Sequence, residues 1–198
     1  MIVDCSSPIS GAAAAAAGVT GVIGYLSGIP GPKIWTAERL ADCTTHKIAV
    51  GFVFENTTAD MAGGAPAGMR NASIALWELA NLFSRAFGED VTGSEVGVYL
   101  ADDHNTPTAG AGAYMKTAQA VLESHGVRTG YYGNQTAAVF LLDVGVTHLA
   151  WGVSSWGADV LRRCQLRQEA NTAQMKIGAT LCDVNTALAS DWGQWPRP

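Results

Sequence analysis

The sequence predicts an α/β protein folded as one compact (β/α)8 barrel of the TIM type, with short loops and some degenerate helices. Apolar runs of strand length alternate with alanine-rich or helix-period segments along the chain, and eight such runs can be counted. The 198 residues are 48% hydrophobic and 15% charged, which fits a single domain over residues 1–198. This length is close to the lower limit of about 200 residues for such barrels. An open doubly wound sheet is the alternative architecture.

The predicted strands coincide with the apolar runs. They are residues 2–5, 19–26, 48–55, 96–103, 127–132, 147–153, 164–169 and 180–185. The third strand is the clearest, because the bulky Val50, Phe52 and Phe54 alternate in it with smaller side chains. Alternate residues of a strand face opposite sides. We therefore expect the bulky set to pack under helices, and the smaller set, which shares its phase with Glu55, to face the barrel interior.

Helix signals fill the segments between these strands. Ser10 is a suitable N-cap for residues 12–17, where six alanines favour helix. Thr36 is the expected cap of a helix that ends near His46. Further helices are expected at residues 72–87, 108–125 and 134–142. Helices between the sixth and eighth strands are expected to be degenerate, because the chain is short for this fold.

The charge balance and the motif content exclude several classes of partner. The formal net charge is −5, so we expect no basic surface that would attract nucleic acid. No apolar stretch reaches the roughly 18–20 residues of a spanning helix, and we expect no membrane partner. No glycine-rich phosphate-binding motif follows a strand, so we predict no nucleotide and no other cofactor. Consecutive strand residues face opposite sides, so we predict no metal site in the Asp-Asp-His-Asn run at residues 102–105.

The cysteines and the N-terminus bear on the compartment. Cys5, Cys43, Cys164 and Cys182 lack the CxxC spacing of zinc or redox sites. We interpret them as buried thiols, with a bridge between Cys5 and Cys182 as the less favoured alternative. Met1 is followed by neither a basic segment nor a long apolar one, so we predict that the chain has no signal peptide.

Carboxylates lie at the ends of four predicted strands. These residues are Asp4, Glu55, Asp103 and Asp183. In a (β/α)8 barrel the C-terminal ends of the strands converge on the mouth that carries the active site. Burying unpaired carboxylates is costly, so four of them at this mouth favour a functional cluster. The alternative is that each acid caps the next helix or pairs with an arginine such as Arg128 or Arg167.

Aromatic and amide side chains on or just after the strands accompany these acids. The candidates for substrate binding are Tyr25, Tyr99, Asn105, Tyr131, Trp151 and Gln168, and Tyr132, Trp156 and Gln165 have similar positions. Sugars present both apolar CH faces and hydroxyl groups, so a lining of this kind suits a glycan. Ordinary core packing is the alternative for many of these residues.

The chain ends in a segment that contains Trp192 and Trp195. Exposed paired tryptophans are uncommon without a partner. We therefore predict that the tail docks across the bottom of the barrel, in preference to contacting a partner.

Short motifs along the chain resemble those of one barrel family. They are VDCSS at 3–7, GYLS at 24–27, FE at 54–55, YLADD at 99–103, GYYG at 130–133, QLRQ at 165–168 and DVNTALASDWGQW at 183–195. Taken in order, they resemble the glycoside-hydrolase-like barrels called domain of unknown function 1906, which occur in actinobacteria and their phages and are related to family 25 lysozymes. The resemblance implies that the acids at the mouth face a peptidoglycan-type cell-wall polysaccharide.

Two hypotheses for function follow. In the first, the protein hydrolyses glycosidic bonds, with Glu55 as acid/base and Asp103 as nucleophile or as the group that orients a substrate N-acetyl group. Asp4 and Asp183 would then hold sugar hydroxyls. Family 25 lysozymes place a general-acid Glu two residues after the strand-four Asp, and the matching residue here is Asn105, whose amide cannot donate a catalytic proton.

The second hypothesis follows from Asn105. It is a non-catalytic barrel that binds glycan or forms part of a phage particle, for example as a minor tail protein, with other phage structural proteins as partners. In both cases we expect a protein made in the host cytoplasm, as a lysin or a virion component, that acts at the cell wall or in the virion.

Overall fold

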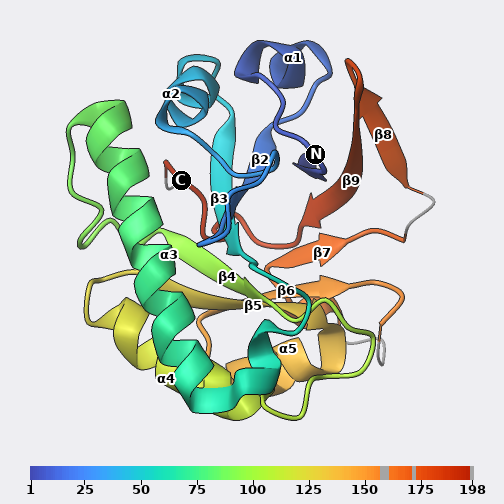
Figure 1. The fold of residues 1–198 in the computed structure, drawn as a ribbon. Coiled ribbons are helices and arrows are strands. Elements are labelled where there is room, and N and C mark those ends of the chain that lie inside the picture. The colour runs from blue at the N-terminus through green and yellow to red at the C-terminus, as the bar shows by residue number, and fades with distance from the viewer. Residues whose placement is uncertain (157–160, 171–172, 197–198) are drawn as a thin grey trace.

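The structure is a computed structural model that describes residues 1–156, 161–170 and 173–196. Its strands close into a barrel, as the sequence predicts (Figure 1). Around the barrel they are β1 (Ile2–Cys5), β2 (Gly21–Leu26), β3 (Ala49–Phe54), β4 (Gly97–Ala101), β5 (Arg128–Asn134), β6 (Leu149–Val153), β7 (Leu166–Gln168) and β9 (Thr180–Ala187), and β9 pairs with β1 to close the ring. The ends of these strands differ from the predicted ends by at most two residues.

The last strand of the barrel runs antiparallel to its neighbours. Strands β1 to β7 pair in parallel, whereas β9 is antiparallel to both β7 and β1. The expectation of eight parallel βα units is therefore wrong for this strand. The cause is an additional strand, β8 (Gln174–Ile177), which forms a hairpin with β9 and reverses the chain. The turn contains Gly178 at a φ of 60°, a left-handed conformation that glycine adopts without strain.

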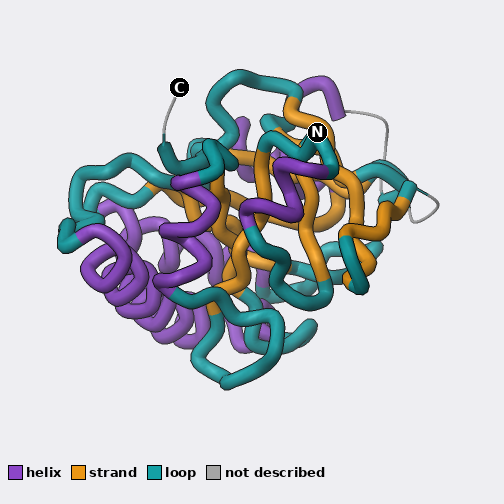
Figure 2. Tube along the Cα trace, turned by 90° about the horizontal axis from the view of Figure 1, so that it is seen from above, coloured by secondary structure: helices purple, strands orange, loops and turns teal. Residues whose placement is uncertain are grey.

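Helices cover the outside of the barrel from β1 to β6 (Figure 1 and Figure 2). They are α1 (Gly11–Ala16), α2 (Ala37–Thr45), α3 (Gly64–Phe87), α4 (Ala111–Glu123) and α5 (Gln135–Asp143), with short 3-10 turns at Asp60–Gly63 and Leu161–Arg163. Between β6 and β9 the described residues contain one 3-10 turn and no α-helix, which agrees with the expected degenerate helices; residues 157–160 and 171–172 of these segments lie outside the described residues. None of the described helices combines the length and the apolar character needed to cross a membrane.

Local sequence explains where these helices begin. Ser10 caps α1, because its hydroxyl oxygen accepts a hydrogen bond from the Ala13 N–H. Helix α3 begins at Gly64, eight residues before the predicted start at residue 72. It therefore includes a glycine-rich segment whose composition is typical of a loop. The reason is packing: a Cβ at position 68 would lie 2.2 Å from the carbonyl oxygen of Tyr114, so Gly68 permits the close approach of α3 and α4.

Strand alternation separates two apolar clusters. Phe52 and Phe54 of β3 point outward and pack with the helices, whereas Val53 points into the barrel, as predicted. The interior cluster consists of Ile2, Ile23, Val53, Tyr99, Ala101, Leu149, Trp151, Leu166 and Trp192. This cluster fills the barrel below its mouth, so polar residues at the ends of the strands lie above an apolar floor.

The C-terminal tail closes the bottom of the barrel, which confirms the predicted docking. Trp192 is buried in the interior, and a Cβ at Gly21 or Gly51 would lie within 2.9 Å of its ring. The Tyr99 hydroxyl donates a hydrogen bond of 2.8 Å to the Trp192 carbonyl oxygen. The absence of side chains at the two glycines therefore makes the space that the Trp192 ring fills.

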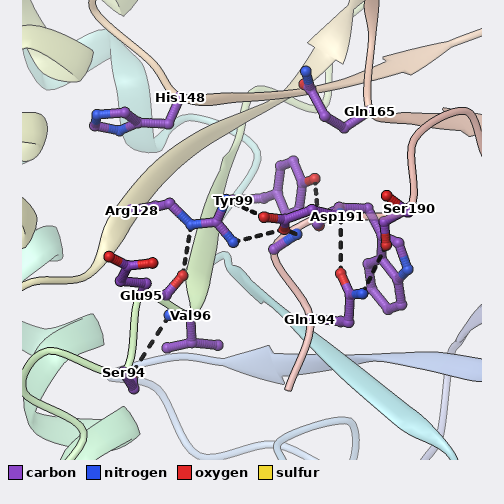
Figure 3. A network of polar contacts seen from close by, with 12 residues as sticks. Ser94, Glu95, Val96, Tyr99, Arg128, His148, Gln165, Ser190, Asp191 and Gln194 are labelled. Atoms are coloured by element: carbon purple, nitrogen blue, oxygen red, sulfur yellow. Dashed lines mark hydrogen bonds and ion pairs between the residues drawn. The ribbon is translucent and has the colours of Figure 1, made fainter. Parts of the chain in front are cut away.

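Polar contacts hold the tail in place (Figure 3). The Arg128 guanidinium donates two hydrogen bonds, of 3.0 and 2.8 Å, to the Asp191 carboxylate. The Gln194 side chain accepts a hydrogen bond from the Trp192 N–H. Two backbone hydrogen bonds, of 2.8 and 2.7 Å, join Val50 to Trp195. The tail is thus part of the barrel rather than a free segment.

A disulfide joins Cys5 to Cys182, which corrects the interpretation of all four cysteines as thiols. The two residues are register partners on the antiparallel strands β1 and β9. Their side chains face each other because of the unforeseen direction of β9. Cys43 and Cys164 are buried free thiols, as predicted.

Replacing both Cys5 and Cys182 with serine is expected to lower the free energy of unfolding by about 2–4 kcal/mol. The bridge ties together residues 177 positions apart in sequence and so restricts the unfolded chain. Urea unfolding measures the loss, and reductant should leave the stability of the double variant unchanged. In unreduced, denatured wild-type protein, alkylation should label Cys43 and Cys164 alone; labelling of all four cysteines would contradict the bridge.

Candidate functional site

Four carboxyl groups line one cavity of about 160 Å³ at the mouth of the barrel. They belong to the four predicted acids. Asp4 lies in β1, Glu55 follows β3 and Asp103 follows β4, so these three come from the C-terminal ends of parallel strands. Asp183 lies in the antiparallel β9 and reaches the cavity because it is the register partner of Asp4. The rest of the lining is Tyr25, Lys33, Val53, Ala101, Tyr132, Trp151 and Gln168.

Asp4 is the most enclosed of these acids, with 5% of its surface exposed. Its Oδ1 accepts a hydrogen bond of 3.2 Å from the Tyr25 hydroxyl, and its Oδ2 accepts one of 2.7 Å from Asn185 Nδ2. Burial raises the pKa of Asp4 to about 7; the Asn185 hydrogen bond opposes this shift and the charge of Asp183 reinforces it. Asp4 therefore holds a proton at weakly acid pH.

The raised pKa of Asp4 predicts a pH dependence of stability. Between the ordinary pKa of 3.8 and the folded value of about 7, the folded protein holds a proton that the unfolded chain has lost. The stability that this proton contributes is complete below pH 3.8 and is lost as the pH rises through about 7. The loss is on the order of a few kcal/mol. Urea unfolding of wild type and Asp4→Asn across this pH range should show that the variant lacks this decrease in the free energy of unfolding. If the two free energies differed by the same amount at every pH, the prediction would be contradicted.

Glu55 is paired with a cation that the sequence analysis did not select. Lys33, from the loop between β2 and α2, donates a hydrogen bond of 2.6 Å from Nζ to Glu55 Oε2. The same ammonium lies 4.2 Å from the centre of the Tyr25 ring. Arg128 and Arg167, the alternative partners, form ion pairs outside the cavity instead. The lining thus combines one ammonium with four carboxyl groups.

Asp102 and Asp103 directly follow β4 and point in opposite directions, as the alternation of the predicted strand indicates. Asp103 lies at the exposed rim of the cavity, where partial burial and the charge of Glu55 raise its pKa above the usual value. Asp102 is buried outside the barrel wall and accepts hydrogen bonds of 2.9 Å from the Tyr131 hydroxyl and the Thr108 N–H. Asp102 therefore anchors the loop after β4, while Asp103 lines the cavity beside the Tyr132 side chain.

Asp183 is held by amides from two neighbouring strands. Its Oδ1 accepts a hydrogen bond of 2.6 Å from Gln174 Nε2, and its Oδ2 accepts one of 3.4 Å from Gln168 Nε2. Gln168 Oε1 in turn accepts a hydrogen bond of 2.7 Å from the Tyr132 hydroxyl. The unforeseen strand β8 thus supplies part of the support for this wall.

Aromatic rings form the other walls of the cavity. The Tyr132 and Trp151 ring centres lie 4.3 Å apart, and Tyr25 lines the cavity from β2, which lies opposite β6 in the ring of strands. Trp151 donates a hydrogen bond of 2.9 Å from Nε1 to Asn185 Oδ1, and Asn185 donates to Asp4. One buried amide therefore fixes both an aromatic wall and the most enclosed acid.

Three of the predicted binding residues lie outside the cavity. Tyr99 shares the interior phase but lies deeper in the barrel, where its hydroxyl contacts the tail. Tyr131 packs with the outer cluster and donates to Asp102. Asn105 is exposed on the loop after β4, and its carbonyl oxygen accepts a hydrogen bond of 2.6 Å from Asn134 Nδ2. Of the predicted set, Tyr25, Trp151 and Gln168 line the cavity.

No protein-family model and no curated protein matches the chain. The Mycobacterium tuberculosis Tat-secreted protein Rv2525c, in complex with L-tartrate, is similar with a TM-score of 0.80 and 20% identity over 98% of each chain. Its complex with HEPES gives a TM-score of 0.78 and 23% identity over 98% of each chain. An uncharacterized B. stearothermophilus protein gives a TM-score of 0.67 and 14% identity over 93% of this chain and 94% of that one. The chain therefore shares its barrel fold with these proteins.

Proposed function

We propose that the acidic cavity binds one sugar residue of a cell-wall polysaccharide and that the protein is a glycoside-hydrolase-like barrel acting on peptidoglycan. The observation that carries this proposal is the meeting of four carboxyl groups and three aromatic rings in one cavity at the barrel mouth. Carboxylates accept hydrogen bonds from sugar hydroxyl groups, and amides both accept and donate them. The aromatic rings offer faces for sugar CH groups. The motif resemblance to family 25 lysozymes and their relatives points to the same substrate class.

The size of the cavity favours a single sugar ring. Its volume is about 160 Å³. Sites for drug-sized ligands usually occupy about 300–1,000 Å³, so several rings would not fit together. The rest of a polymer must then lie outside the cavity, on the surface around the mouth.

Glu55 and Asp103 are the pair that we assign to bond cleavage. Asp103 lies at the rim of the cavity, and partial burial and the charge of Glu55 shift its pKa upward, in the direction that favours the role of proton donor to the leaving oxygen. Glu55, beside the Lys33 ammonium, suits the role of the second carboxylate, which either attacks the anomeric carbon or activates the water that does so. This assignment exchanges the roles expected from the sequence. Asp4 and Asp183 would bind sugar hydroxyls.

Incubation with actinobacterial cell walls tests the proposal. Pure protein should sediment with the insoluble walls and release new reducing ends from purified peptidoglycan. The anomeric form of the product distinguishes a covalent glycosyl-enzyme route from direct attack by water. A protein that neither sediments with the walls nor releases reducing ends would contradict the proposal.

A second candidate function is glycan binding without cleavage, for example by a component of a phage particle. The observation that favours it is Asn105, which lies where related lysozymes carry a general acid and which does not line the cavity. Sedimentation with walls, without release of reducing ends, would favour this candidate.

We further propose that the protein works outside the cytoplasm. The Cys5–Cys182 disulfide supports this, because such bonds persist in oxidising compartments. The structurally similar Rv2525c is described as Tat-secreted, which agrees with this proposal.

A further inference from the structure

A row of hollows leads away from the acidic cavity. A hollow of about 300 Å³ beside the β2–α2 loop shares Lys33 and Glu55 with the cavity. A hollow of about 320 Å³ shares Ser27, Pro30, Gly31 and Ile34 with the first. A groove of about 410 Å³ between α2 and α3 shares Trp35, Thr36 and Glu78 with the second. Each hollow thus borders the next, from the barrel mouth to the outer face of α3.

We propose that this row is the path of the glycan chain whose end occupies the acidic cavity, and that Trp77 on α3 is the platform for a distal sugar. The inference rests on the proposed function and adds the length of substrate that the protein recognises. The small cavity supports it, because a polymer that places one ring there must continue over the surface.

The chemistry of the distal groove suits a sugar. The Trp77 side chain is 64% exposed, although burial is usual for a residue of this size. Glu78, Asn81 and Arg85 lie around it and offer both acceptors and donors. A ring face surrounded by hydrogen-bonding groups matches a pyranose, which has apolar CH faces and a rim of hydroxyls. On the loop between the two sites, Ile29 is 52% exposed and adds apolar surface.

The loop that carries the path is held in one conformation. Asn56 Oδ1 contacts the Ser27 hydroxyl and accepts a hydrogen bond from the Gly28 N–H, each at 2.7 Å. The Trp35 N–H donates to the Tyr25 carbonyl oxygen at 3.0 Å. Trp35 also packs on β2, where a Cβ at Gly24 would lie 2.7 Å from its ring. A preformed surface loses less entropy when it binds an extended ligand.

Trp77→Ala tests the path, with Phe140→Ala as a matched control. Phe140 is 61% exposed on α5 and borders none of these hollows. Calorimetry should compare peptide-free peptidoglycan strands, from the disaccharide to the octasaccharide. Every protein in this series carries Glu55→Gln so that no strand is cleaved, and the protein without a further substitution serves as the wild-type reference. Wild-type affinity should rise with length, and Trp77→Ala should lose about tenfold for the longer strands while keeping its affinity for the disaccharide. Phe140→Ala should bind like wild type at every length.

The outcomes separate the two proposals. Absence of binding at every length would overturn both of them. Wild-type affinity that does not rise with length, or equal affinity of wild type and Trp77→Ala for the octasaccharide, would overturn the path alone. Because Trp77 is exposed, its substitution should leave the melting temperature unchanged, so a lost affinity reports on binding rather than folding.

Discussion

Glu55→Gln is expected to reduce the release of reducing ends from purified peptidoglycan by at least about 100-fold. Glutamine has the shape of glutamate but cannot act as a nucleophile or a base. The melting temperature should change little, because the Lys33–Glu55 pair is partly open to solvent and such pairs contribute little to stability. The measurement is the initial rate of reducing-end release over a range of peptidoglycan concentrations.

Glu89→Gln is the matched control for this variant, because Glu89 is exposed and lies outside the cavity. It should cleave at the wild-type rate. Unaltered activity of Glu55→Gln would remove Glu55 from the reaction. Sedimentation of the inactive variant with cell walls would show that binding survives the loss of cleavage.

Trp192→Ala is expected to lower the free energy of unfolding by about 3–5 kcal/mol. The ring fills the bottom of the barrel against two glycines, so truncation leaves a cavity that the strands cannot close. For a chain of 198 residues this loss corresponds to a decrease of roughly 10 °C in melting temperature. Trp77→Ala, the exposed counterpart, should unfold like wild type in the same urea titration.

A double-mutant cycle makes this prediction specific. In the wild-type background Gly51→Ala should be destabilising, because the new Cβ would lie 2.5 Å from the Trp192 ring. In the Trp192→Ala background the same substitution fills vacated space and should cost less or restore stability. Additive effects of the two substitutions would show that the ring does not occupy this position.

Strand alternation allowed the fold and the four acids to be predicted, although Asp183 reaches the cavity from an antiparallel strand. The phase of β3 placed Val53 inside and Phe52 outside, and Glu55 then followed in the interior phase at the mouth. The direction of β9 is not encoded in such a pattern, because a strand alternates in the same way in both directions. The chain reversal depends on the short β8 and on Gly178, and the disulfide depends on that reversal.

Phase alone does not give depth along a strand. Tyr99 and Asp103 share the interior phase, but at about 3.3 Å per residue Tyr99 lies roughly 13 Å below Asp103. It therefore belongs to the floor and the tail rather than the cavity. In the pair Tyr131-Tyr132 the sequence does not tell which ring faces inward, and the structure assigns Tyr132 to the cavity.

Lys33 shows a further limit of prediction from sequence. It lies on a loop without periodicity, so no pattern relates its side chain to the barrel mouth. The structure places its ammonium on Glu55, where it offsets the negative charge of the cavity.

An NMR titration tests most directly whether the acidic cavity is a sugar site. Soluble peptidoglycan fragments are added to isotope-labelled protein, and the indole N–H resonances of its tryptophans are followed. The Trp151 resonance should shift with saturation, because this indole lines the cavity and is bonded to Asn185. The Trp192 resonance, at the bottom of the barrel, should stay in place. A Trp151 resonance that no wall fragment moves would contradict the account.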